Sequence, residues 1–157
     1  MKESDIKIRL IECSREELDN ADRELLEKAE AMTRSAYAPY SNFLVGAAIR
    51  LNDGTIVTGS NQENAAFPSG TCAERSACFY AGANYPNNTF ETIAVAARET
   101  GGEWTEQPIS PCGGCRQALL EYEKRAGHPV KVILGGRHNI YILPSVKSLL
   151  PFAFTDF

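Results

Sequence analysis

Two kinds of repeat in the hydrophobic pattern divide this chain into predicted strands and predicted helices. Short apolar or alternating stretches, typical of strands, cover residues 6–10, 45–51, 55–59, 93–97, 130–134 and 140–143. Apolar residues at helical spacing, or residues that favour helix, cover residues 15–36, 72–84, 112–125 and 145–150.

Local signals mark the ends of several of these segments. Ser14 and Glu17 fit a capping box at the start of the first helix, and Pro39 requires that helix to end before it. The turn sequence Asn-Asp-Gly at 52–54 joins two strands as a hairpin. Strands that alternate with helices after a hairpin imply an α/β fold, a mixed central sheet of about five strands flanked by helices. We expect one domain over residues 1–157, with an additional N-terminal strand in residues 1–12.

Composition narrows the class of protein. The chain has 157 residues, 43% of them hydrophobic and 23% charged, which is ordinary for a globular domain. No apolar run reaches the roughly 20 residues of a membrane span, and the polar N-terminus lacks a signal core, so we expect a cytoplasmic protein with no membrane contact. Sixteen basic and 20 acidic residues give a net charge of −4 without a basic stripe, which argues against nucleic-acid binding.

Three cysteines and one glutamate carry the candidate chemistry. Cys112 and Cys115 are three residues apart, so on a helix both sulfurs share one face, and Cys72 would come from the start of another helix. Three sulfur ligands suit Zn²⁺ and leave its fourth tetrahedral position open for water. Glu74 is not needed as a ligand, so we predict that it moves protons while activated water attacks an electrophilic carbon.

Arg75 follows Glu74 directly and is the obvious cation to offset the charge of three thiolates. We predict that Arg75 donates a hydrogen bond to a cysteine sulfur. The positive ends of the two predicted helices would act in the same direction, because they favour the thiolate form.

Other interpretations of the cysteines remain open at this point. A Cys-x-x-Cys pair also occurs in redox sites and in structural zinc sites. A structural zinc would take a fourth ligand, which Cys13 or Cys78 would have to supply. Cys78 lies six residues past Cys72, on the opposite side of the predicted helix, so we expect it to be a small buried residue.

Five motifs, in order over residues 15–155, resemble the cytidine deaminases. They are YAPYSNFLVGAA at 37–48, NQENA at 61–65, CAER at 72–75, SPCGGCRQ at 110–117 and LLP at 149–151. The resemblance implies a three-layer cytidine-deaminase-like fold and one zinc ion per subunit. It also implies a hydrolase that converts cytidine and 2′-deoxycytidine to uridine and 2′-deoxyuridine, with release of ammonia, in pyrimidine salvage.

The resemblance also assigns roles around the substrate, a small nucleoside. Asn61 and Glu63 match family residues that bind the ribose 3′-hydroxyl, Phe43 matches one that packs near the base, and the backbone at Ala73 would contact the pyrimidine. An Asx turn is the alternative for Asn61, and a core position is the alternative for Phe43.

The family's short, three-cysteine members look like homotetramers that share residues between active sites. Phe154 falls where such proteins place an aromatic residue that closes the site of another subunit. The three phenylalanines at 152, 154 and 157 would form an unusual apolar patch in a monomer, which favours an assembly.

Two segments depart from the pattern: residues 1–12 are usually absent from the short enzymes, and residues 67–71 match only loosely. Competing functions are a deaminase of a cytosine-containing antibiotic such as blasticidin S, an editor of polynucleotides, and a non-catalytic zinc-binding protein. The paired Asn61 and Glu63 favour a nucleoside over the antibiotic, the acidic balance counts against a polynucleotide, and the intact Glu74 counts against a scaffold.

Overall fold

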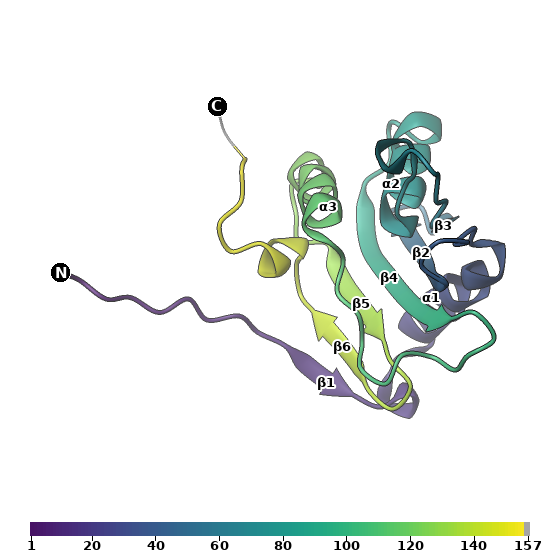
Figure 1. Cartoon of the computed structure of the whole chain (residues 1–157). Helices are drawn as coiled ribbons and strands as arrows, with labels where there is room; N and C mark the ends of the chain where they lie inside the picture. Colours follow the sequence, from purple (N-terminus) through teal and green to yellow (C-terminus); the bar gives the residue numbers. More distant parts are fainter. Residues whose placement is uncertain (156–157) are drawn as a thin grey trace.

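A six-stranded mixed sheet forms the centre of the protein in a computed structural model that describes residues 1–155 (Figure 1). The strands are β1 (Ile11–Cys13), β2 (Phe43–Leu51), β3 (Ile56–Ser60), β4 (Phe90–Glu99), β5 (Lys131–Gly135) and β6 (Ile140–Leu143). Their order in the sheet is β1-β6-β5-β4-β2-β3, and β4 and β5 run parallel while the other neighbours are antiparallel. The helices are α1 (Asn20–Met32), α2 (Ala73–Asn84) and α3 (Gly113–Ala126).

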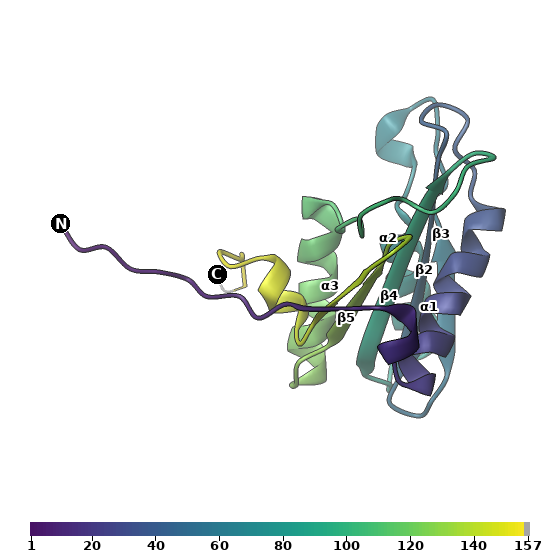
Figure 2. The same ribbon diagram turned by 90° about the horizontal axis from the view of Figure 1, so that it is seen from below.

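Helices cover both faces of this sheet, which confirms the expected layered α/β fold (Figure 2). Neighbouring residues of β2 show how the faces divide, because side chains alternate along a strand. Ala48 packs with the α1 residues Leu25 and Leu26, whereas Ile49 packs in the second cluster with residues of α2 and α3. Because both faces are covered, the middle parts of the central strands, residues 45–49, 93–97 and 132–134, are continuous runs without polar side chains. Within residues 1–155, no helix combines the length and apolar character needed to cross a membrane.

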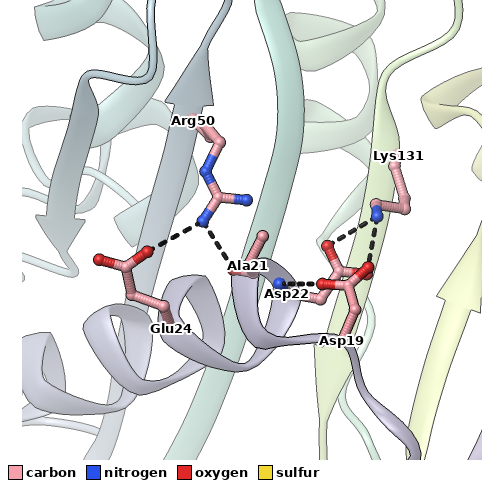
Figure 3. Close-up of polar contacts among 6 residues, drawn as sticks. All are labelled: Asp19, Ala21, Asp22, Glu24, Arg50 and Lys131. Carbon is pink, nitrogen blue, oxygen red and sulfur yellow. Dashed lines mark hydrogen bonds and ion pairs between the residues drawn. The ribbon is translucent and has the colours of Figure 1, made fainter.

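Polar contacts fix α1 against the sheet (Figure 3). The buried Asp22 carboxylate lies 2.6 Å from Lys131 Nζ on β5, and Arg50 on β2 donates to the Ala21 carbonyl at 2.6 Å. Asp19 caps the helix by accepting a hydrogen bond from the Asp22 amide at 2.7 Å. The helix therefore begins later than residue 15. The predicted capping box is present, with Glu17 accepting from the Ser14 amide at 2.8 Å, but it starts only the 3₁₀ turn Arg15–Glu17.

The N-terminal strand also lies later than its alternating pattern predicted. Residues 6–10 belong to no strand, and β1 begins at Ile11, where it pairs with Ile142 of β6. β6 ends at Leu143, one residue past the partner of Ile11, and Pro144 follows, so β6 has no residues opposite positions 6–9. The sheet thus has six strands instead of about five. The predicted last helix is the 3₁₀ segment Val146–Leu149.

Two glycines allow the helices to lie unusually close to the β2–β3 hairpin. A Cβ atom on Gly46 would lie 1.9 Å from the Ala29 carbonyl oxygen of α1. On the other face, a Cβ on Gly59 would lie 2.6 Å from the Ala77 amide nitrogen and 2.7 Å from the Ala73 carbonyl oxygen. Gly59 therefore sets how closely the first turn of α2 approaches the sheet.

Candidate active site

The three predicted sulfur ligands meet at one point. The Sγ atoms of Cys72, Cys112 and Cys115 all lie within 4.8 Å of one another, and those of Cys72 and Cys112 are 3.9 Å apart. A tetrahedral zinc ion with bonds of about 2.3 Å to sulfur needs its ligands about 3.8 Å apart. The arrangement therefore fits a zinc ion held by three cysteines. Among the Cys, His, Asp and Glu side chains of residues 1–155, these three cysteines form the group whose ligand atoms lie close enough together to hold a metal ion.

Two helix N-termini bring the sulfurs together, as the spacing predicted. Cys72 is the N-cap of α2 and Cys112 is the N-cap of α3, and Cys115 lies one turn into α3. Neither helix has a side-chain hydrogen bond at its N-cap, so the positive ends of both dipoles face the sulfur cluster. This field stabilises thiolates, the form in which cysteine binds metal.

Arg75 adds a full positive charge to the cluster. Its Nη2 atom lies 3.8 Å from Cys72 Sγ, within hydrogen-bond distance for sulfur. Hydrogen bonds from Cys115, Arg75 and Cys112 lower the pKa of the Cys72 thiol to about 5, although burial opposes this shift. The hydrogen bond to Cys72, together with burial, raises the pKa of Cys115. The guanidinium of Arg75 therefore favours the thiolate form of Cys72.

Glu74 lines the same cavity as Cys72 and Cys112, which has a volume of about 620 Å³. Its side chain is 4% exposed, and burial raises the pKa of its carboxyl. A carboxyl group with a raised pKa exchanges protons more readily near neutral pH than an ordinary glutamate does.

Glu63 and Asn61 also line this cavity. The backbone amides of Tyr40 and Ser41 both donate to Glu63 Oε2, at 2.9 and 3.3 Å. Hydrogen bonds from Ser41 and from the Tyr40 amide lower the pKa of Glu63, so the carboxylate form is favoured. Asn42, directly after these two donors, adopts a left-handed conformation with a φ of 57°.

The Asn61 side chain is joined to the start of β2. Its Oδ1 accepts from the Val45 amide at 2.8 Å, and its Nδ2 donates to the Phe43 carbonyl at 2.8 Å. A carboxamide has a second N–H and a second acceptor position, so these bonds leave capacity for a ligand. Asn61 thus holds a strand end and faces the cavity at the same time.

Phe43 and Ala73 complete the predicted set around the cavity. Phe43 is the first residue of β2 and is half-buried, so its ring is available to a planar ligand. Ala73 is fully buried at the first position of α2, where it contributes a small side chain to the lining of the cavity.

Phe154 lies outside the cavity of its own chain. Its side chain is 68% exposed, and its carbonyl oxygen accepts from Gln117 Nε2 at 2.7 Å. The terminal phenylalanine predicted to join this patch, residue 157, lies outside the described residues. The spare cysteines take no part in the cluster. Cys78 is fully buried, and burial raises its pKa to about 12.

Arg116, to which the sequence pattern gave no role, joins the loop before α3 to the C-terminal segment. Its guanidinium donates to the Pro111 carbonyl at 2.8 Å, to Ser110 Oγ at 3.0 Å and to the Leu149 carbonyl at 2.9 Å. The signal was its position directly after the last cysteine of the motif. Three carbonyl and hydroxyl partners hold the loop that presents Cys112.

Comparison with known proteins agrees with this geometry. A sequence profile described as the cytidine and deoxycytidylate deaminase zinc-binding region matches residues 19–127. The cytidine deaminase of Halalkalibacterium halodurans is 38% identical over 135 residues, which cover 85% of this chain and 95% of the relative. The chain belongs to the cytidine deaminase family. The cytidine deaminase of Sporosarcina psychrophila is 37% identical over 131 residues, or 83% and 89% of the two chains.

Solved structures of cytidine deaminases share the fold. The crystal structure from Burkholderia pseudomallei superposes with a TM-score of 0.69 and 40% identity, and the match covers 83% of this chain and 97% of the other. The structure from Mycobacterium tuberculosis gives a TM-score of 0.62 and 31% identity, covering 85% and 96%. The matched family region is described as zinc-binding, which favours a metal site over a redox pair for these cysteines.

Proposed function

We propose that this protein hydrolytically deaminates cytidine and 2′-deoxycytidine, with release of ammonia, as a step of pyrimidine salvage. One observation carries the proposal: three sulfurs lie within 4.8 Å of one another, and two of these cysteines, Cys72 and Cys112, line a cavity that also contains a buried glutamate. Membership of the cytidine deaminase family and the presence of Asn61 and Glu63 in the lining of the same cavity support a nucleoside as the substrate.

In the proposed reaction, Cys72, Cys112 and Cys115 hold a zinc ion, one per subunit. A zinc ion at such a site acts as a Lewis acid that brings the pKa of water down to about 7. Glu74 accepts the proton from the attacking water and delivers it to the ring nitrogen beside C4. It then carries a second proton to the departing amine, so one carboxyl serves both transfers, as in zinc deaminases generally.

The remaining residues bind and orient the nucleoside. We assign the ribose 3′-hydroxyl to the second N–H of Asn61 and to Glu63, whose other oxygen is held by two backbone amides. Phe43 packs against the pyrimidine ring, and the backbone at Ala73 contacts its polar edge. Arg75 orients and neutralises the thiolate of Cys72 from 3.8 Å.

The proposed working unit is a cytoplasmic homotetramer in which each chain is a single domain. Large exposed apolar side chains support an assembly, namely Phe79, Tyr80, Phe152 and Phe154. In this unit Phe154 reaches the active site of a neighbouring subunit, since it lies outside the cavity of its own chain.

Loss of the cytidine absorbance band tests the reaction directly. The purified protein, assayed together with its zinc content, should deaminate cytidine and 2′-deoxycytidine. A chelator should abolish both activities, and added zinc should restore them. A zinc-replete sample that leaves both nucleosides unchanged, or that prefers blasticidin S, overturns the proposal.

A further inference from the structure

The first ten residues form an extended arm that leaves the body of the protein beyond β1 (Figures 1 and 2). Residues 1–10 belong to no helix or strand, and β6 ends before it could pair with them. The side chains of Ile6, Ile8 and Leu10 are 55%, 48% and 47% exposed. Three exposed apolar side chains on alternate residues of an unpaired extended segment indicate that the segment packs against a partner.

The charges of the arm specify what that partner is. In an extended chain, odd- and even-numbered residues point to opposite faces. The even face carries Ser4, Ile6, Ile8 and Leu10, and the odd face carries Glu3, Asp5, Lys7 and Arg9. Read along the chain, the odd face is acidic, acidic, basic, basic. Such a sequence is complementary to itself when it is reversed.

We propose that the arm pairs antiparallel with the arm of a second copy of this chain, about a two-fold axis at Ile6. In this register Glu3 lies opposite Arg9 and Asp5 lies opposite Lys7, each pair occurring twice. Opposite charges in directly facing positions stabilise a strand pair, and like charges destabilise it.

Other registers that also keep odd-numbered residues opposite odd-numbered residues bring like charges together. Centring the pair on Lys7 places that lysine opposite its own copy. Centring it on Ile8 places Lys7 opposite Arg9 twice. The two-fold axis at Ile6 is therefore the register in which the charged face contains no like-charged pair.

The geometry accommodates two whole molecules. A strand rises about 3.4 Å per residue, so Ile11, where β1 begins, lies about 17 Å from the axis and about 34 Å from its copy. The two bodies then lie at opposite ends of the paired arms, and each β1 keeps its pairing with β6. Such a contact is isologous and closes on itself as a dimer contact.

A two-stranded ribbon alone is marginally stable, so the contact should be strongest between copies already held together by other surfaces. The ionic face should also make it sensitive to salt, because exposed ion pairs are screened. Salt dependence therefore distinguishes this contact from a subunit contact made by the exposed aromatic side chains of the folded domain, which salt would weaken less.

Cysteine cross-linking tests the register. Ile6→Cys places two thiols opposite each other on the axis, so mild oxidation should convert most chains to covalent dimers at low salt and far fewer at high salt. Ile8→Cys is the matched control, since its two copies would lie about 14 Å apart, too far for a disulfide. The unsubstituted chain reports any background from the native cysteines. Absence of the Ile6→Cys dimer at high protein concentration, or stronger cross-linking through Ile8→Cys, overturns the proposal.

Charge exchange tests the pairing chemistry on the Ile6→Cys background. Glu3→Lys with Asp5→Lys makes one arm basic throughout, and Lys7→Glu with Arg9→Glu makes another acidic throughout. Each variant alone should lose most of its cross-linking, and an equal mixture should restore it as mixed dimers. Cytidine turnover reports folding, because the arm lies outside the cavity. If either charge variant alone cross-links as strongly as Ile6→Cys without further changes, the register is wrong. Sedimentation of a protein that consists of residues 11–157 tests the proposed tetramer separately.

Discussion

At the scale of single residues, the proposed reaction depends on one carboxyl group. Glu74→Gln keeps the size and burial of the side chain but removes its ability to carry a proton. We expect the zinc content to be unchanged and the turnover of cytidine to fall by about 10²–10⁴-fold or more, the usual contribution of a positioned acid or base. Elemental analysis and the ultraviolet assay measure the two quantities on the same sample.

Glu121→Gln provides the matched control for this change. Glu121 is exposed on α3, so the same chemical substitution there should leave turnover at the level of the unsubstituted protein. Near-normal activity of a zinc-replete Glu74→Gln protein would show that another group carries the protons.

At the scale of secondary-structure elements, Gly59 determines where α2 lies. In Gly59→Ala the new Cβ meets backbone atoms of residues 73 and 77, which cannot rotate away. We expect a loss of about 1–3 kcal/mol in the free energy of unfolding. We also expect a loss of bound zinc, because α2 carries Cys72 while the other two sulfurs belong to α3. Denaturant unfolding and a zinc assay measure the two effects.

Gly102→Ala is the control for Gly59. Its Cβ would meet atoms of Glu99 alone, the nearest being the Glu99 Cβ at 3.2 Å, and Gly102 lies exposed in a loop that carries none of the three cysteines. It should leave zinc content unchanged. A stable, zinc-replete Gly59→Ala protein would mean that α2 can shift without disturbing the cluster.

Glu123 holds the far end of α3. Its buried carboxylate accepts from the amides of Val130 and Val146, both at 2.8 Å, and from Ser145 Oγ at 2.7 Å. Glu123→Gln turns one of these acceptors into a donor, so we expect a loss of about 2–3 kcal/mol in the free energy of unfolding. Thermal and denaturant unfolding measure it against Glu121→Gln, two residues away on the exposed side. Equal stability of the two variants would contradict the buried-acceptor role.

At the scale of the whole molecule, the proposed assembly predicts complementation between two impaired chains. A Glu74→Gln chain still offers Phe154 to its neighbours, and a Phe154→Ala chain still has an intact site. Coexpressed mixed oligomers should therefore be more active than either parent alone. The double variant mixed with Phe154→Ala should show no such recovery. Activity equal to the average of the parents would mean that Phe154 serves no neighbouring site.

The sequence predicted those parts of the fold that depend on local pattern. The hairpin, the buried strands and the two helices that begin at Cys72 and Cys112 follow from hydrophobic period, turn residues and cysteine spacing. The residues of the candidate site were also predicted, although their roles stay predictions. What the sequence could not show depends on distant partners. Residues 6–10 have a strand pattern, but β6 is too short to pair with them. The hydrogen bonds from two backbone amides to the Glu63 carboxylate depend on the conformation of the loop that ends at Asn42.

The division of the sulfur cluster between two helices has a consequence for biosynthesis. Forty residues separate the first ligand, at 72, from the second, at 112. While the ribosome is still making β4, the nascent polypeptide contains only one of the three cysteines of the cluster, too few to hold a metal ion in the proposed site. Completion of that site therefore has to wait until the starts of both helices have been made.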